Sequence, residues 1–158
     1  MMKNILFVAS EGVPFIKTGG LADVVGSLPK CIDKQYFDVR VILPKYTCMS
    51  QAMKDKMSYI THFYMDFHWK NEYVGILEAE VYYFIDNEMF FNGFKPYCDN
   101  ALFEIEKFAF FSKAALSILP VIDFRPDLIH CHDWQTGLVP VYLKERFQGS
   151  DFYRGIKS

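Results

Sequence analysis

The sequence predicts an α/β fold, a Rossmann-like and mostly parallel sheet with flanking helices and a small antiparallel hairpin insertion. Strand-like and helix-like segments alternate at both ends of the 158-residue chain, an order typical of parallel sheets with right-handed crossovers. Between them, residues 59–69 and 72–77 are consecutive runs rich in aromatic and β-branched residues, which indicate a hairpin at the sheet edge. The length fits one domain, residues 1–158.

The first part of the chain predicts two strands and a helix. Residues 4–10 form a continuous apolar run, typical of a parallel strand that is buried on both faces. Apolar side chains at helical spacing predict a helix over residues 21–34, which Pro29 should kink or interrupt. Residues 37–43 have the alternation of a strand, and Pro44 closes it.

The middle of the chain is more varied in composition. Residues 47–56 are polar and rich in methionine, and they predict a loop or a short helix. Lys70 and Asn71 separate the two runs of the hairpin and are its expected turn. Residues 81–85 return as a short apolar strand, and residues 87–99 have the composition of a functional surface loop.

The last third of the chain predicts a long helix, a short strand and a final helix. The long helix is capped by Asp99 or Asn100 and is apolar over most of its girth. Residues 127–131 predict the strand, and residues 136–147 predict the final helix. The side chains expected on the buried side of that helix are Leu138, Val139, Val141, Tyr142 and Leu143. The chain then ends as though another strand were about to begin, so we expect it to be a fragment.

Composition and charge disfavour several classes of function. A formal net charge of -2, with no basic cluster on any predicted helix, disfavours a nucleic-acid partner. The apolar N-terminal run is too short to span a membrane and has no cleavage site, so we expect a cytoplasmic protein with no membrane partner. The 4 cysteines are widely spaced and form no C-x-x-C pair, which predicts free thiols.

The first candidate site is the stretch K-T-G-G-L-A-D-V-V-G-S-L-P at residues 17–29. Gly19 and Gly20 let the backbone approach a ligand, and the N–H groups and dipole of the helix that follows favour an anion. With the charge of Lys17, the stretch indicates a site for a phosphate or for closely packed hydroxyl groups. It matches neither G-x-G-x-x-G nor the P-loop pattern, which disfavours a plain dinucleotide site. The alternative is a simple turn, with Lys17 and Asp23 as solvated surface charges.

The second candidate site is His130-Cys131-His132-Asp133-Trp134, at the end of the last predicted strand. His130 and His132 lie on one side of an extended chain, but no further ligand has metal-site spacing, so no metal is expected. One histidine is expected to pack against Trp134 and the other to be hydrogen-bonded. Asp133 is the cap of the next helix, a carboxylate that faces a cleft, or both. Both candidate sites follow strands, so they should open on the same edge of the sheet.

A third feature is the group Tyr97, Asp99 and Asn100 in the middle loop. An aromatic face beside short polar groups is suited to stacking on a sugar ring and hydrogen-bonding its hydroxyl groups. The alternative is that Tyr97 fills the core and Asp99 caps the long helix.

Taken together, these motifs resemble the bacterial glycogen synthase and plant starch synthase family. The resemblance rests on K-x-G-G-L-A-D-V-V-G-x-L-P at residues 17–29 and on R-P-D-x-x-H-x-H-D-W at residues 125–134. Residues 5–11, residues 41–44 and Tyr97 with its polar neighbours also match. The resemblance implies a retaining glucosyltransferase with two Rossmann-like domains (GT-B), which moves glucose from ADP-glucose to the non-reducing end of an α-1,4-glucan. The chain would be a truncated N-terminal Rossmann-like domain, residues 1–158, of such an enzyme.

The resemblance also implies roles for individual residues. Asp23 and Asp133 would be catalytic residues in the cleft, near the transferred glucose and the acceptor end. Lys17 would approach the distal phosphate of the donor, as its charge suggests. The other implied substrate-binding residues are Gly19, Gly20, Tyr97 and His132. No cofactor or metal is implied, because ADP-glucose is the donor substrate.

The family's C-terminal domain, with its nucleotide pocket and its phosphate-binding Arg/Lys pair, is not in this sequence. The expected partners are therefore a nucleotide sugar, an α-1,4-glucan and this C-terminal domain of the same enzyme, and the isolated chain is expected to be inactive. Two alternatives remain open. One is a related GT-B glycosyltransferase with another acceptor, and the other is a non-catalytic glucan-binding or regulatory module.

Overall fold

Four parallel strands form the centre of the protein, as the alternation of strand-like and helix-like segments predicts. The computed structural model describes residues 2–158, and its six-stranded sheet has the order β3-β4-β5-β2-β1-β6. The parallel strands are β1 (Lys3–Val8), β2 (Phe37–Pro44), β5 (Tyr82–Asp86) and β6 (Leu128–Cys131). The antiparallel hairpin consists of β3 (Ser58–Phe67) and β4 (Lys70–Ala79), with β3 at the edge. The predicted α/β class with a hairpin insertion is therefore confirmed.

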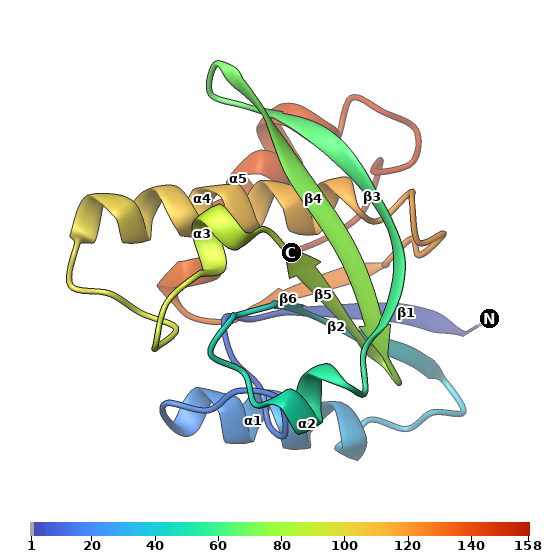
Figure 1. Ribbon diagram of the computed structural model, residues 1–158. Helices are drawn as coiled ribbons and strands as arrows, with labels where there is room; N and C mark the ends of the chain where they lie inside the picture. Colours follow the sequence, from blue (N-terminus) through green and yellow to red (C-terminus); the bar gives the residue numbers. More distant parts are fainter. Residues whose placement is uncertain (1) are drawn as a thin grey trace.

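Helices cover both faces of this sheet (Figure 1). The helices are α1 (Gly20–Cys31), α2 (Gln51–Lys54), α3 (Glu88–Phe91), α4 (Ala101–Ser117) and α5 (Leu138–Tyr142). Figure 1 shows α1 and α2 on one side of the sheet, and α4 and α5 on the other. Within residues 2–158, no helix is both long and apolar enough to cross a lipid bilayer.

The core lies between the central strands and α4. Leu6 and Val8 face one side of the sheet and Val41 faces the other, because side chains alternate along a strand. All three are fully buried, since helices cover both faces. On α4, Phe110 stacks on Phe90 of α3 with ring centroids 4.4 Å apart. The long helix is thus buried around most of its circumference, as its composition predicts.

Two predictions in the N-terminal half of the chain need correction, the position of the hairpin turn and the end of α1. The hairpin turns at His68 and Trp69, not at Lys70 and Asn71, because Lys70 pairs with Phe67 and continues the ladder. His68 has a φ of 56°, a left-handed conformation suited to a tight turn. Helix α1 ends at Cys31, earlier than predicted, and Pro29 lies within its last turn without interrupting it.

The middle loop and the final helix also differ from expectation. The middle loop contains α3, which buries Phe90 and Phe91 and is capped by the Asn87 side chain. The final helix is divided into a 3-10 turn (Trp134–Thr136), α5 and a π-helical turn (Leu143–Phe147). Of its five expected core side chains, Leu138 and Val141 are exposed. They are three residues apart and lie on one side of the helix, whereas Val139 and Leu143, four residues apart, lie on the buried side.

Candidate functional site

The loops after β1 and β6 emerge side by side at the carboxyl edge of the sheet. These strands are parallel neighbours, with Val8 opposite Cys131, so the glycine stretch and the His-Asp-Trp segment leave the sheet together. The loop before α4, which carries Tyr97, lies at the same end of the sheet (Figure 1). The predicted convergence of the two main motifs on one sheet edge is confirmed.

The glycine loop is open where the chain enters α1. Gly19 is extended, with φ −152° and ψ −165°, and α1 begins at Gly20. A Cβ atom added at Gly20 would meet no protein atom within 4 Å, and one at Gly19 would make only an ordinary contact with Glu11. Neither residue has a positive φ, so the backbone conformation itself does not require glycine here. The space beside these two residues and the first N–H groups of α1 is therefore free for a ligand.

Lys17 and Asp23 form an ion pair beside this open backbone. The Lys17 ammonium donates to both carboxylate oxygens of Asp23, at 2.7 Å each. Both side chains are more than half exposed, so the pair is screened by solvent and adds little to stability. Lys17 can therefore exchange Asp23 for another anion at small cost.

A buried carboxylate, which sequence reasoning did not identify as a site residue, shapes the same loop. Glu11 is 3% exposed and accepts hydrogen bonds from both the backbone N–H and the hydroxyl of Thr18. It thereby fixes the segment between Lys17 and the glycines. The available signal was its position, because a charged residue directly after a buried strand lies at the sheet edge where ligands bind.

Tyr97 joins this cluster from the loop before α4. Its hydroxyl shares a hydrogen bond of 2.8 Å with Ser10, a fully buried residue just after β1. Burial raises the pKa of Tyr97 to about 12, the charges of Glu11 and Asp133 add to this rise, and the hydrogen bond to Ser10 opposes it. The phenol therefore remains protonated near neutral pH and can donate a hydrogen bond.

Asp99 and Asn100, the polar neighbours of Tyr97, do not lie in the cluster with it. Asp99 is exposed and pairs with Lys95 at 3.6 Å, away from the cluster. The Asn100 side chain caps α4 by accepting from the N–H of Phe103. The predicted group of three therefore contributes only Tyr97 to the sheet edge, and the cap of α4 is Asn100.

His132 is packed beneath the site and is not bound to Trp134. Its ring stacks on Phe7 with centroids 5.4 Å apart and lies 4.4 Å from the ring of His130. Burial lowers the pKa of His132, His130 lowers it further, and Asp133 opposes both. Its Nε2 atom is buried and has no hydrogen-bond partner among residues 2–158. A neutral imidazole with one unpaired nitrogen thus lies just beneath the site, out of contact with solvent.

Asp133 has a strained backbone, and this conformation explains the wrong expectation about Trp134. With φ 58° and ψ 179°, Asp133 lies in a region that is populated almost only by glycine. The bend turns Trp134 toward α4, where its ring contacts Phe108 edge-on at 5.3 Å. Asp133 makes no capping hydrogen bond, so its exposed carboxylate is free and the cap interpretation is wrong.

Other chemistry at this edge is limited. Burial raises the pKa of the Cys131 thiol to about 11, so the thiol is protonated and is a poor nucleophile. In the described part of the chain, residues 2–158, no three His, Cys, Asp or Glu side chains are grouped as a metal site would require. All four cysteines are free thiols.

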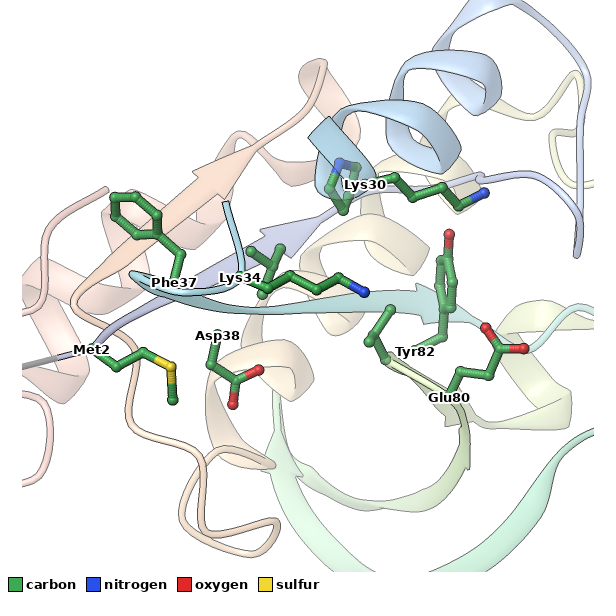
Figure 2. Close-up of a pocket in the computed structure, with 10 residues that line it drawn as sticks. Met2, Lys30, Lys34, Phe37, Asp38, Glu80 and Tyr82 are labelled. Atoms are coloured by element: carbon green, nitrogen blue, oxygen red, sulfur yellow. The ribbon is translucent and has the colours of Figure 1, made fainter. Parts of the chain in front are cut away.

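A separate pocket of about 330 Å³ lies at the opposite edge of the sheet. It is lined by residues at the starts of β2 and β5 and by the end of α1, and the side chains of Lys30 and Lys34 extend toward Tyr82 and Glu80 (Figure 2). In parallel strands the amino ends are remote from the carboxyl ends, so this pocket includes none of the residues at the glycine loop.

Comparisons with known proteins agree with the motifs. The family model described as the starch synthase catalytic domain matches residues 4–158. Glycogen synthases from Lachnospira eligens and Lachnoclostridium phytofermentans are 65% and 64% identical, over 99% of this chain and 34% of each relative. The solved catalytic domain of starch synthase IV from Arabidopsis thaliana, bound to ADP and acarbose, is 31% identical with a TM-score of 0.81. That match covers 99% of this chain and 32% of the plant protein.

The chain therefore spans about a third of the length of the relatives that it matches. The family match extends over residues 4–158 and therefore includes both motifs at the sheet edge. This chain belongs to the starch synthase catalytic domain family, whose members include the bacterial glycogen synthases.

Proposed function

We propose that this chain is the N-terminal part of a glycogen synthase that transfers glucose from ADP-glucose to the non-reducing end of an α-1,4-glucan, with retention of configuration. The observation that carries the proposal is the convergence of Lys17, the open glycine backbone and Asp133 on one sheet edge. The identity to glycogen synthases over this whole region supports the same activity.

The donor's diphosphate would lie at the start of α1. When the bond between glucose and the diphosphate breaks, negative charge grows on the leaving phosphate oxygen. The N–H groups of α1 and the Lys17 ammonium, released from Asp23, would stabilise that charge. A related protein, the Arabidopsis starch synthase, was solved with ADP bound, which supports ADP-glucose as the donor.

The transferred glucose would lie between this loop and the end of β6. Positive charge develops on the sugar as the leaving group departs, and the free carboxylate of Asp133 is suited to stabilise it. Tyr97 can donate a hydrogen bond to the sugar, and the buried, unpaired Nε2 of His132 would bind a sugar hydroxyl group after a shift of its side chain. Asp23, once it has released Lys17, would face the same cleft.

The remaining catalytic groups would come from a C-terminal Rossmann-like domain of the same GT-B enzyme. That domain would bind the nucleotide base and supply further positive charge to the phosphates. Because one wall of the cleft would otherwise be missing, we expect the 158-residue chain alone to bind the donor weakly and to be inactive. The whole enzyme would act in the cytoplasm. It would need no cofactor, because ADP-glucose is a substrate.

The test is glucan-dependent release of ADP by the full-length protein that contains this chain. With glycogen as acceptor we expect ADP release from ADP-glucose and elongation of the glucan, and no release from the 158-residue chain under the same conditions. No transfer by the full-length protein would contradict the proposed activity. Transfer by the short chain would contradict the need for a second domain.

A further inference from the structure

A buried ion pair on α4 lies directly beneath the loop that carries Tyr97. Glu104 and Lys107 are one helical turn apart, their side chains are 8% and 4% exposed, and their charged groups are in contact. Such a pair is unusual in a core, because two charges lose their hydration and replacement by apolar residues is often neutral for stability. The contacts of the two side chains indicate what the pair does.

Both charged groups bind the backbone on either side of Tyr97. The Lys107 ammonium donates to the carbonyl of Pro96 at 2.7 Å, and a carboxylate oxygen of Glu104 accepts from the N–H of Cys98 at 3.0 Å. The residues immediately before and after Tyr97 are therefore held by one ion pair. This loop has no regular secondary structure of its own. These two hydrogen bonds therefore satisfy backbone groups that a helix or strand would otherwise pair.

The same region of α4 also supports the Tyr97 ring and the turn after β6. The Lys107 ammonium lies 4.9 Å from the centre of the Phe108 ring. Phe108 in turn contacts the rings of Tyr97 at 6.1 Å and Trp134 at 5.3 Å. One turn of α4 thus fixes the tyrosine loop and the residue next to Asp133.

We propose that Glu104 and Lys107 are positioning residues for Tyr97, an inference that rests on the proposed glucosyltransferase function. The ion pair fixes the backbone at residues 96 and 98, and the hydrogen bond to Ser10 fixes the hydroxyl at the far end of the side chain. The phenol is thereby held in one place at the sheet edge before any ligand binds. Pre-organisation of this kind matters because displacement of a catalytic-site group by about 1 Å can cost about 100-fold in rate.

The experiment uses the full-length protein and removes both charges together. The variant Glu104→Leu/Lys107→Met leaves no lone buried charge and breaks both backbone contacts. The variant Glu104→Gln/Lys107→Met also removes the charges, but its amide oxygen can still accept from Cys98. Lys113→Met is the matched control, because Lys113 lies on the same helix and also donates to a backbone carbonyl, that of Asp66, away from the tyrosine loop.

Each variant is made in the wild-type and in the Tyr97→Phe background, and two quantities are measured. The first is kcat for glucan-dependent ADP release. The second is hydrogen exchange of the backbone amides in residues 95–100 other than Pro96, which reports on the loop whether or not the protein is a glucosyltransferase. Thermal unfolding of every variant identifies those that are folded. If the leucine variant does not fold, the glutamine variant takes its place in the comparison of the two backgrounds.

We expect Glu104→Leu/Lys107→Met to lower kcat about 10- to 100-fold, with faster exchange at residues 95–100. The glutamine variant should recover part of both effects, and Lys113→Met should change kcat less than about twofold. In the Tyr97→Phe background the leucine variant should cause almost no further loss. An equal loss in both backgrounds, or unchanged exchange and kcat, would overturn the proposal. Absence of transfer by the wild-type enzyme would instead overturn the proposed function, and the exchange result would still stand.

Discussion

Lys17 and Asp23, which the sequence places separately in the glycine stretch, form one ion pair with both N–O distances at 2.7 Å. The pair lies at the N-terminus of α1, where the helix dipole favours an anion. Asp23 therefore binds the Lys17 ammonium group, which a phosphate would otherwise bind. Because both side chains are exposed, the pair is weak enough to open when a more highly charged anion arrives.

The first prediction concerns the charge of Lys17. In the full-length protein, Lys17→Ala should lower kcat/KM for ADP-glucose about 100-fold, the scale seen when one group that stabilises a developing charge is removed. The free energy of unfolding should change by less than about 1 kcal/mol, because the lost ion pair is exposed. Lys3→Ala is the control, since it also removes an exposed ion pair, with Asp127 at 3.0 Å, but far from the glycine loop. Similar kinetic effects of the two substitutions would exclude Lys17 from the site.

The second prediction concerns the strained backbone of Asp133. Asp133→Gly should raise the free energy of unfolding by about 1 kcal/mol, because glycine adopts this φ and ψ freely, although it gains entropy when unfolded. It should also abolish glucosyl transfer with the loss of the carboxylate, as should Asp133→Asn without the gain in stability. Urea unfolding and ADP release measure the two effects.

Asp123→Gly provides the control for this strain, because Asp123 also has a positive φ, of 50°, and lies outside the site. It should leave transfer unchanged. If Asp133→Gly lowered the stability, the strained conformation would not be the dominant effect at this position.

The third prediction concerns Glu11 and the shape of the glycine loop. Glu11→Ala should lower the free energy of unfolding by about 2–3 kcal/mol, because two hydrogen bonds to a buried carboxylate are lost. It should also weaken ADP-glucose binding, since Thr18 no longer fixes the segment beside Lys17. Glu106→Ala, an exposed glutamate on α4, should change neither quantity. Urea unfolding and KM are the measurements, and a neutral Glu11→Ala would show that the loop keeps its shape without this carboxylate.

The fourth prediction concerns pH and His132. Burial lowers the pKa of His132 in the folded chain below its ordinary value of 6.5, so the unfolded chain binds more protons in the interval between the two values. The free energy of unfolding should therefore fall as the pH drops below about 6.5, and it should be independent of this group above that value. His132→Gln should flatten this dependence, whereas His68→Gln in the exposed hairpin turn should not. Urea unfolding at pH 7.5 and 5.5 measures it, and an unchanged slope in His132→Gln would contradict the assignment.

The sequence by itself determined the architecture and the location of the candidate site. The continuous apolar run at residues 4–10 identified a central strand, because a strand covered on both faces has no polar side, and the alternation of strands and helices identified the sheet as parallel. The order of strands and helices then placed the ends of β1 and β6 at one edge, since parallel neighbours end together. Lys17, Gly19, Gly20 and Asp133 were located in this way from local patterns.

Only the tertiary structure decided how those residues are held and which neighbours act with them. Tyr97 reaches Ser10 across 87 positions in the sequence, and such a contact depends on where the sheet places two separate loops. The bend at Asp133, which turns Trp134 from the histidines to Phe108, has no local sequence pattern. Local propensity sets the type of an element, but the direction of a side chain at a strand end is set by the segments that pack on it.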